Sequence, residues 1–198
     1  MGKQDPVSDS KKSKNRPSRW VITIFLVTMV ISGCITLISD EIMANSNIVV
    51  AFLILLIIVL IGILFDVIGM AVATADEKPF HSMAARKVPG AQEAITLLRN
   101  AERVSSICND VVGDICGVVG GSASATVAVA LFRATEALPE RVMTLIMSAV
   151  VAGLTVGGKA IGKTYAINCC TAIVYTVSKI LYKLRHLPDA FKKKKRKR

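Results

Sequence analysis

Apolar residues in this chain gather into long uninterrupted runs instead of recurring on one helical face. The runs cover residues 20–40, 48–75 and 105–132, and a fourth begins at Val142. A transmembrane helix needs about 20 apolar residues, whereas a helix of a water-soluble protein is apolar along one stripe only. The pattern therefore predicts an all-α, polytopic membrane protein with about four transmembrane helices.

The segments between and after these runs predict amphipathic helices that lie on the membrane surface. Residues 91–103 place apolar side chains at helical spacing directly after Pro89 and Gly90. Residues 167–187 predict a second surface helix, with a re-entrant or fifth membrane segment as the alternative. Residues 40–47 are acidic and lack Lys and Arg, which predicts a short loop between the first two runs.

Positive charge is distributed unevenly among the polar segments. The chain has 198 residues, with 25 Lys+Arg against 14 Asp+Glu. Of the 25, only Arg133 and Arg141 fall in the turn between the third and fourth runs, and none falls in the acidic loop. Because Lys and Arg are enriched on the cytoplasmic side of membranes, we expect a multi-pass cell-membrane protein with both termini in the cytoplasm.

The two ends of the chain are basic and polar. Residues 1–19 have a composition that cannot bury a core, so we expect a disordered cytoplasmic tail. Residues 188–198 form a polybasic tail ending in KKKKRKR, which we expect to contact anionic lipid at about 1 kcal/mol per basic residue. A solvated tail without function is the alternative. No aromatic residues are interleaved with the basic ones, so nucleic acid is not an expected partner.

Residue types typical of catalysis are sparse. His81 and His186 each stand alone in a polar segment, without a nucleophile or metal-protease spacing beside them. The five cysteines include no CxxC pair, so free thiols are expected. We expect neither an enzyme nor a bound cofactor.

Three carboxylates and one amide fall inside the second and third apolar runs. Asp66 lies nine residues before the end of its run, and Asp114 lies nine residues after the start of the next, so both are about 13 Å from the cytoplasmic side. Asp110 and Asp114 are four residues apart and share a helix face, with Asn109 beside it. Carboxylate and amide oxygens are hard ligands that suit Mg²⁺. The sequence predicts a divalent-cation site of Asp66, Asn109, Asp110 and Asp114.

Ion pairing is the competing interpretation of these buried charges. Lys159 and Lys163 are also four residues apart, near the cytoplasmic end of the fourth run. They could meet Asp110 and Asp114 across a helix interface, because buried charges usually occur in pairs. Spacing alone favours neither interpretation, since both neutralise charge at membrane depth. A proton relay is a third option.

Small residues dominate the second half of the third run. Gly117 and Gly121 are four residues apart, a spacing that allows close helix packing. We expect these glycines to pack within one subunit instead of forming a dedicated dimer motif.

Three segments, GAQEAITLL over 90–98, NAERVSS over 100–106 and GKAIGKTYA over 158–166, follow one another along the chain. In this order they resemble the transmembrane domain of the CorB/CorC (cyclin-M) family of magnesium and cobalt transport proteins. The family's surface linker has the signature GA..AL.LL..PERLLS, and this chain reads GAQEAITLL over 90–98 and NAERVSS over 100–106. The family's closing motif, GEIIPKTIA, corresponds here to GKAIGKTYA over 158–166. The resemblance extends from about Ile63 to Leu184.

The resemblance implies a protein of Mg²⁺ or Co²⁺ transport or homeostasis, and a homodimer. It assigns residues 48–187 to the transmembrane domain and makes the helix over 20–40 an addition, while the family's cytosolic regulatory domains do not follow. The chain also departs from the family. The family's first helix ends in a pattern like FFSxSExAL, whose earlier Ser and Glu fall at Asp66 and Gly69 here, and the Glu of the closing motif falls at Lys159. Because Lys159 would repel or replace a cation, a non-transporting scaffold or regulator with buried Asp–Lys pairs remains the alternative.

Overall fold

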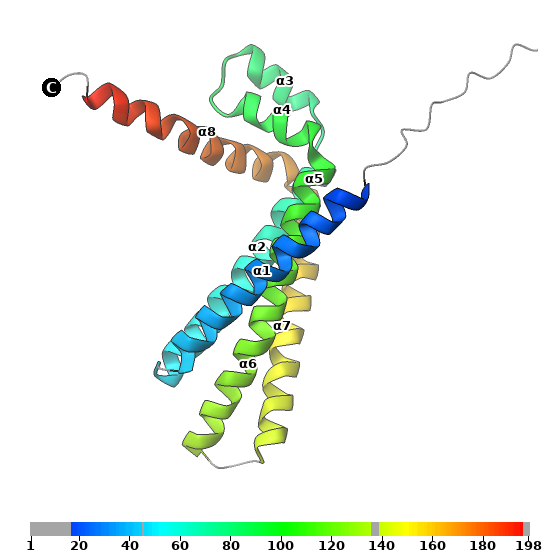
Figure 1. The fold of residues 1–198 in the computed structure, drawn as a ribbon. Coiled ribbons are helices and arrows are strands. Elements are labelled where there is room, and N and C mark those ends of the chain that lie inside the picture. Colours follow the sequence, from blue (N-terminus) through cyan, green and yellow to red (C-terminus); the bar gives the residue numbers. More distant parts are fainter. Residues whose placement is uncertain (1–16, 45, 136–138, 196–198) are drawn as a thin grey trace, which may run out of the picture.

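Helices make up all the regular structure in the residues that the computed structural model describes, which are 17–44, 46–135 and 139–195 (Figure 1). The predicted all-α fold is confirmed. The predicted tail over 1–19 lies mostly outside the described residues. In chain order the helices are α1 (Pro17–Ala44), α2 (Ile48–Thr74), α3 (Lys78–Ala85), α4 (Ala91–Arg99), α5 (Ala101–Ser106), the π-helix η1 (Ile107–Gly113), α6 (Asp114–Thr135), α7 (Glu140–Asn168) and α8 (Cys170–Lys195).

Four helical stretches are long and apolar enough to cross a membrane: α1, α2, the continuous stretch from α5 through η1 to α6, and α7. This matches the predicted number of crossings. The third is longer than the run over 105–132, because it begins at Ala101 and ends at Thr135. A membrane protein is the class that this architecture defines.

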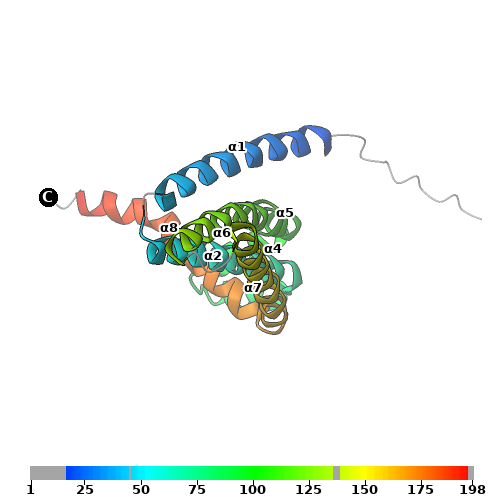
Figure 2. The same ribbon diagram turned by 90° about the horizontal axis from the view of Figure 1, so that it is seen from below.

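The centre of the bundle is formed by α2, α6 and α7, which pack closely on one another (Figure 2). Leu55 and Val59 of α2 meet Ala123 and Val127 of α6 in a buried cluster. Glycines bring the helices together, since a Cβ atom at Gly62 would lie 2.9 Å from the Cβ of Cys116. Small residues at such contacts let helix backbones approach inside a membrane.

The spaced glycines Gly117 and Gly121 do not take part in this packing. A Cβ atom at either position would meet nothing within 4 Å, whereas Gly120 faces Val59 at 3.8 Å. The expectation that 117 and 121 pack within the subunit is therefore wrong. The face of α6 that contacts α2 instead contains Cys116 and Gly120, each one residue before a glycine of that pair.

The first helix, α1, lies on the outside of the bundle, mainly against α6 (Figure 2). Its apolar side chains are largely exposed, and Ser39 and Met43 near its end are buried. The loop predicted over 40–47 is shorter than expected, because α1 continues to Ala44. No Gly or Pro interrupts this stretch, and polar side chains near a helix end do not prevent the helix from continuing.

A second buried cluster holds the surface helices at one end of the bundle. Phe80 of α3, Ile95 and Leu98 of α4, and Val174 of α8 pack together with the end of α2. The single helix predicted over 91–103 is divided, since α4 ends at Arg99 and α5 begins two residues later. Asn100 has φ −111° and ψ 25°, which interrupts the helix between them.

The last helix, α8, packs on α4 and leaves the bundle at a steep angle to α7 (Figure 1). It is not among the four candidate crossings found in the described residues. Of the alternatives for residues 167–187, the arrangement favours the surface helix. Its backbone is helical as far as Lys195, so it includes part of the predicted polybasic tail.

The helix ends are consistent with an even number of crossings. The beginning of α1, the end of α2 and the end of α7 lie at the end of the bundle that carries α3, α4 and α8 (Figure 1). The end of α1, the start of α2, the end of α6 and the start of α7 lie at the opposite end. Helices α3, α4 and α8, which carry many of the Lys and Arg residues, thus lie on one side, which the charge distribution predicts to be cytoplasmic.

Candidate cation site between α2, η1 and α7

Asp66 is the only charged residue of α2, and it is buried, with 5% of its surface exposed. It lies eight residues before Thr74, or about 12 Å along the helix from that end. The side chain points between helices, where Lys159 of α7 lies 3.9 Å away, measured from Nζ to Oδ1. A carboxylate at this depth is costly unless a partner or an ion compensates it.

The distance between Asp66 and Lys159 has two consequences. At 3.9 Å the charges attract one another, but hydrogen bonds of this kind span about 2.7–3.2 Å. Lys159 therefore compensates the charge of the carboxylate without filling its hydrogen-bonding capacity. The other oxygen, Oδ2, is buried and has no hydrogen-bond partner in the described residues. Such an unsatisfied buried acceptor costs about 1–3 kcal/mol, and more when it is charged.

Asn109 of η1 supplies a second buried oxygen without a partner. Its Nδ2 donates to Ser105 Oγ at 3.3 Å, while its Oδ1 accepts no hydrogen bond from the described residues. The amide lies against Gly69, and a Cβ atom there would overlap Asn109 Oδ1. Gly69 follows Asp66 by about one helical turn, so both oxygens belong to the contact between α2 and η1.

The π-helix η1 shapes this contact. Its hydrogen bonds span one residue more than those of an α-helix, and such segments occur frequently at functional sites. The ammonium of Lys159 lies against η1, because its Nζ is 3.4 Å from the position of a Cβ at Gly113. The absence of a side chain at Gly113 leaves room for the lysine.

The remaining predicted ligands lie elsewhere. Asp110 is exposed, and its Oδ2 accepts a hydrogen bond from Ser106 Oγ at 2.7 Å. Asp114 is exposed at the start of α6. Over the described ranges, no three His, Cys, Asp or Glu side chains come close enough to hold a metal ion. The structure thus brings Asp66 to Lys159 and does not gather the three aspartates.

The lysines also differ from one another. Lys163 is exposed, and no ion pair of the described residues joins it or Lys159 to Asp110 or Asp114. The equal spacing of the two pairs in the sequence predicted that Lys159 and Lys163 would meet Asp110 and Asp114 of the third crossing. The partner of Lys159 is instead Asp66, on the second.

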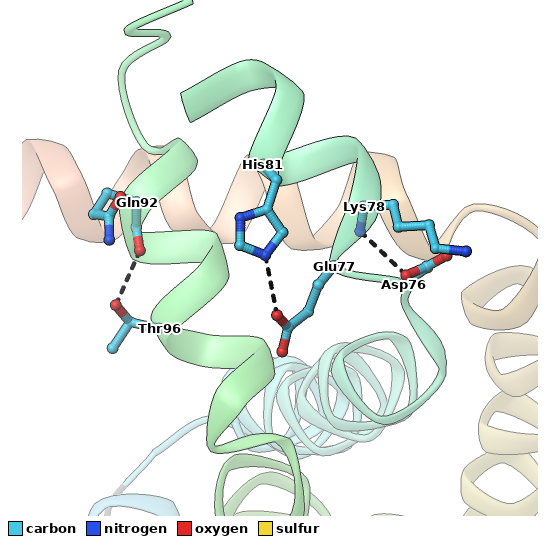
Figure 3. A network of polar contacts seen from close by, with 6 residues as sticks. All are labelled: Asp76, Glu77, Lys78, His81, Gln92 and Thr96. Atoms are coloured by element: carbon cyan, nitrogen blue, oxygen red, sulfur yellow. Dashed lines mark hydrogen bonds and ion pairs between the residues drawn. The ribbon is translucent and has the colours of Figure 1, made fainter. Parts of the chain in front are cut away.

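Polar contacts outside the bundle are local (Figure 3). His81 Nε2 lies 3.3 Å from Glu77 Oε2, one turn earlier, with His81 exposed and Glu77 partly exposed. Asp76 Oδ1 accepts a hydrogen bond from the backbone N–H of Lys78 at 3.1 Å. These contacts stabilise the start of α3, where backbone N–H groups lack helical partners. The side chain of His186 lies outside the described residues.

The fold and this site define a multi-pass helical membrane protein with a buried, incompletely satisfied carboxylate. No family model, curated protein sequence or solved structure matches the chain. The functional argument therefore rests on the arrangement of Asp66, Asn109 and Lys159.

Proposed function

We propose that this protein transports divalent cations, Mg²⁺ or Co²⁺, across the membrane, with Asp66 and Asn109 as oxygen ligands inside the bundle. The observation that carries the proposal is the buried Asp66 carboxylate, whose Oδ2 has no hydrogen-bond partner in the described residues. Asn109 Oδ1 adds a neutral acceptor from the facing helix. Carboxylate and amide oxygens are the ligands that hard divalent cations take in proteins.

Two further features support a cation pathway. Ionisable residues inside membrane-spanning helices commonly mark ion or substrate routes, and Asp66 lies in a helix able to cross the membrane. The resemblance of residues 90–106 and 158–166 to CorB/CorC transport proteins points to the same ions.

Asp110 and Asp114 have a less direct part in the proposal. Both side chains are exposed, so they would reach an ion near Asp66 only through water or through a movement of η1. Mg²⁺ keeps several of its waters when bound, which allows such indirect contacts. The proposal is therefore tested first at Asp66.

The proposal is tested by Mg²⁺-dependent thermal stabilisation of the purified protein in detergent. Binding to the folded state adds about 2.7 kcal/mol when the ion is at 100 times its Kd. We expect the wild type to show this rise in Tm and Asp66→Asn to lose it. Asp76→Asn is the matched control, since Asp76 is exposed and its hydrogen bond needs only a side-chain oxygen, which Asn retains. Equal stabilisation of Asp66→Asn and the wild type would contradict the proposal.

A non-transporting scaffold or regulator is the second candidate, and the 3.9 Å contact between Asp66 and Lys159 favours it. Under this candidate the pair is structural, and removing one partner costs about 3–5 kcal/mol. The exchange Asp66→Lys/Lys159→Asp would then restore stability that each single variant loses, and Mg²⁺ would not raise the Tm of the wild type. Mg²⁺ stabilisation of the wild type that depends on Asp66 excludes this candidate.

The proposal also includes the surroundings of the site. By resemblance the protein would act as a homodimer, and the open positions at Gly117 and Gly121 would let another helix approach α6 closely. The basic ends would contact anionic lipid on the cytoplasmic side. The first expectation follows from the resemblance and the open positions on α6, and the second from the sequence alone.

A further inference from the structure

Lys159 is the feature of the site that cation transport does not by itself explain. A fixed positive charge 3.9 Å from the proposed ligand opposes a second cation. Yet the lysine is held differently from its partner, because 24% of its side chain is exposed against 6% for Asp66. The carboxylate is enclosed, whereas the lysine side chain is partly exposed.

We propose that Lys159 is a displaceable internal counter-ion of the cation site. Its ammonium neutralises Asp66 in the absence of a bound ion and withdraws when a divalent cation binds. The lysine then sets the affinity of the site by competing with the cation for the same carboxylate. This inference rests on the proposed function and adds a residue that controls it.

The geometry of the contact suits displacement. At 3.9 Å the ammonium makes no hydrogen bond to Asp66 Oδ1, so withdrawal breaks no such bond. Asp66 Oδ2 is without a partner in the described residues, so an arriving cation finds a vacant acceptor. The lysine stem is long and flexible, and it can carry the charged end toward water while its methylenes stay buried.

The position of Lys159 on α7 allows its side chain to move toward the end of that helix. Lys159 lies nine residues before Asn168, about 13 Å from the end of α7 that carries the surface helices. Gly113 places no side chain over the ammonium, whose Nζ is 3.4 Å from the position that a Cβ would take there. Lys159 can therefore move along the contact without displacing a side chain of residue 113.

Competition by Lys159 would serve transport in two ways. It lets Asp66 remain charged at membrane depth without an ion, where an uncompensated carboxylate is costly. It also weakens cation binding, and an ion pathway needs sites from which the ion can leave. A fixed opposite charge this close to the carboxylate competes strongly with an arriving cation, so we expect its removal to tighten cation binding by at least about tenfold.

The test is a titration with Mg²⁺ alone of purified wild-type, Lys159→Gln and Lys163→Gln protein in detergent, followed by calorimetry and by Tm. We expect Lys159→Gln to bind Mg²⁺ at least about tenfold more tightly than the wild type. Lys163→Gln removes the same charge one turn further along α7 at an exposed position, and should bind like the wild type. Lys159→Arg keeps the charge and should also stay near the wild-type affinity.

Folding of Lys159→Gln provides a second readout. Without Mg²⁺ this variant should have a lower Tm than the wild type, because Asp66 loses its counter-charge. Saturating Mg²⁺ should recover that loss, so the rise in Tm is larger than in the wild type. A variant that can be purified only in the presence of Mg²⁺ also supports the inference.

Failure of the inference is distinguishable from failure of the proposed function. Mg²⁺ binding that Asp66→Asn abolishes, but that Lys159→Gln leaves unchanged or weakens, overturns the counter-ion and keeps the cation site. No Mg²⁺ binding by the wild type, Lys159→Gln and Lys159→Arg alike overturns the proposed function, and the inference with it. Equal tightening by Lys163→Gln shows a general charge effect and also overturns the inference.

Discussion

A buried carboxylate such as Asp66 needs both an opposite charge and hydrogen-bond donors, and its surroundings supply only the charge. Lys159 supplies an opposite charge at 3.9 Å, and no described group donates a hydrogen bond to Asp66 Oδ2. A carboxylate held for structure alone is expected to satisfy both, because an unsatisfied buried acceptor weakens the fold. The lack of a hydrogen-bond donor for Asp66 Oδ2 is the physical reason for proposing a cation here.

The first prediction concerns Gly69, whose lack of a side chain leaves room for the Asn109 amide. In Gly69→Ala the new Cβ atom would overlap Asn109 Oδ1, so the amide must move out of the contact between α2 and η1. Overpacking of this kind costs about 1–3 kcal/mol. We expect a lower Tm in detergent and weaker Mg²⁺ stabilisation.

Gly153→Ala is the control for this substitution. A Cβ atom at Gly153 meets nothing within 4 Å, and Ala is favoured over Gly inside a helix by about 0.5–1 kcal/mol. Its Tm should be unchanged or slightly higher. Equal effects of the two substitutions would show that the packing around Asn109 is looser than described.

The sequence indicated most of these residues but not how they meet. Asp66, Asn109 and Lys159 were identified because polar groups inside apolar runs are conspicuous. Their pairing was not, although Asp66 and Lys159 lie eight and nine residues from helix ends on the same side of the bundle. The similar distance of the two residues from the same end of the bundle was the signal in the sequence that could have predicted their pairing. The i, i+4 argument for Asp110 and Asp114 assumed an α-helix, and η1 alters that spacing up to Gly113.

At the scale of helices, the third crossing and the surface helices are coupled. The stretch that begins as α5 beside α4 continues through η1 into α6. Movement of the surface helices would therefore act directly on Asn109, which lies in η1. The contact between α4 and α8 holds these surface helices in place.

The second prediction concerns Gly90, which precedes α4. Its φ is +89°, a conformation that side chains rarely adopt, and a Cβ atom there would lie 3.1 Å from the backbone N and Cα of Lys179. Gly90→Ala should therefore both strain the turn and push α8 from α4. We expect a loss of about 1–3 kcal/mol, measured as Tm, and faster proteolytic cleavage within α8.

Gly157→Ala separates this effect from a general loss of glycine. Position 157 has open space around its Cβ and lies in α7, away from the contact between α4 and α8. This variant should keep the wild-type rate of cleavage. Unchanged cleavage and Tm in Gly90→Ala would mean that α8 does not depend on the turn at Gly90.

The length of the apolar runs was enough to predict the four crossings, because a segment of about 20 apolar residues has few alternatives to spanning a bilayer. It did not predict the break at Asn100, the helix over 78–85 or the π-helix. The helix over 78–85 has a local start signal, Pro79 in its first turn, whereas the break at Asn100 and the π-helix have none and lie in the stretch that packs on α2. Helix α1 extends to Ala44, into the predicted loop, because acidic residues near a helix end do not stop the helix.

As a whole, the molecule consists of a three-helix centre, an outer first helix and a cluster of surface helices at one end (Figures 1 and 2). The buried carboxylate lies in the centre, within about 12 Å of the end that carries the surface helices. Helices α3, α4 and α8, which carry many of the described basic residues, lie at that same end. This arrangement places the proposed site nearer the side predicted to be cytoplasmic.

The most direct test of the central claim is Mg²⁺ and Co²⁺ uptake into liposomes that contain the purified protein and a trapped cation-sensitive dye. The wild type and Asp76→Asn should take up the ions at similar rates, and Asp66→Asn should be slower by at least about tenfold, the effect of one lost charged ligand. Flat traces for all three proteins, or equal uptake by Asp66→Asn and the wild type, would contradict cation transport through Asp66.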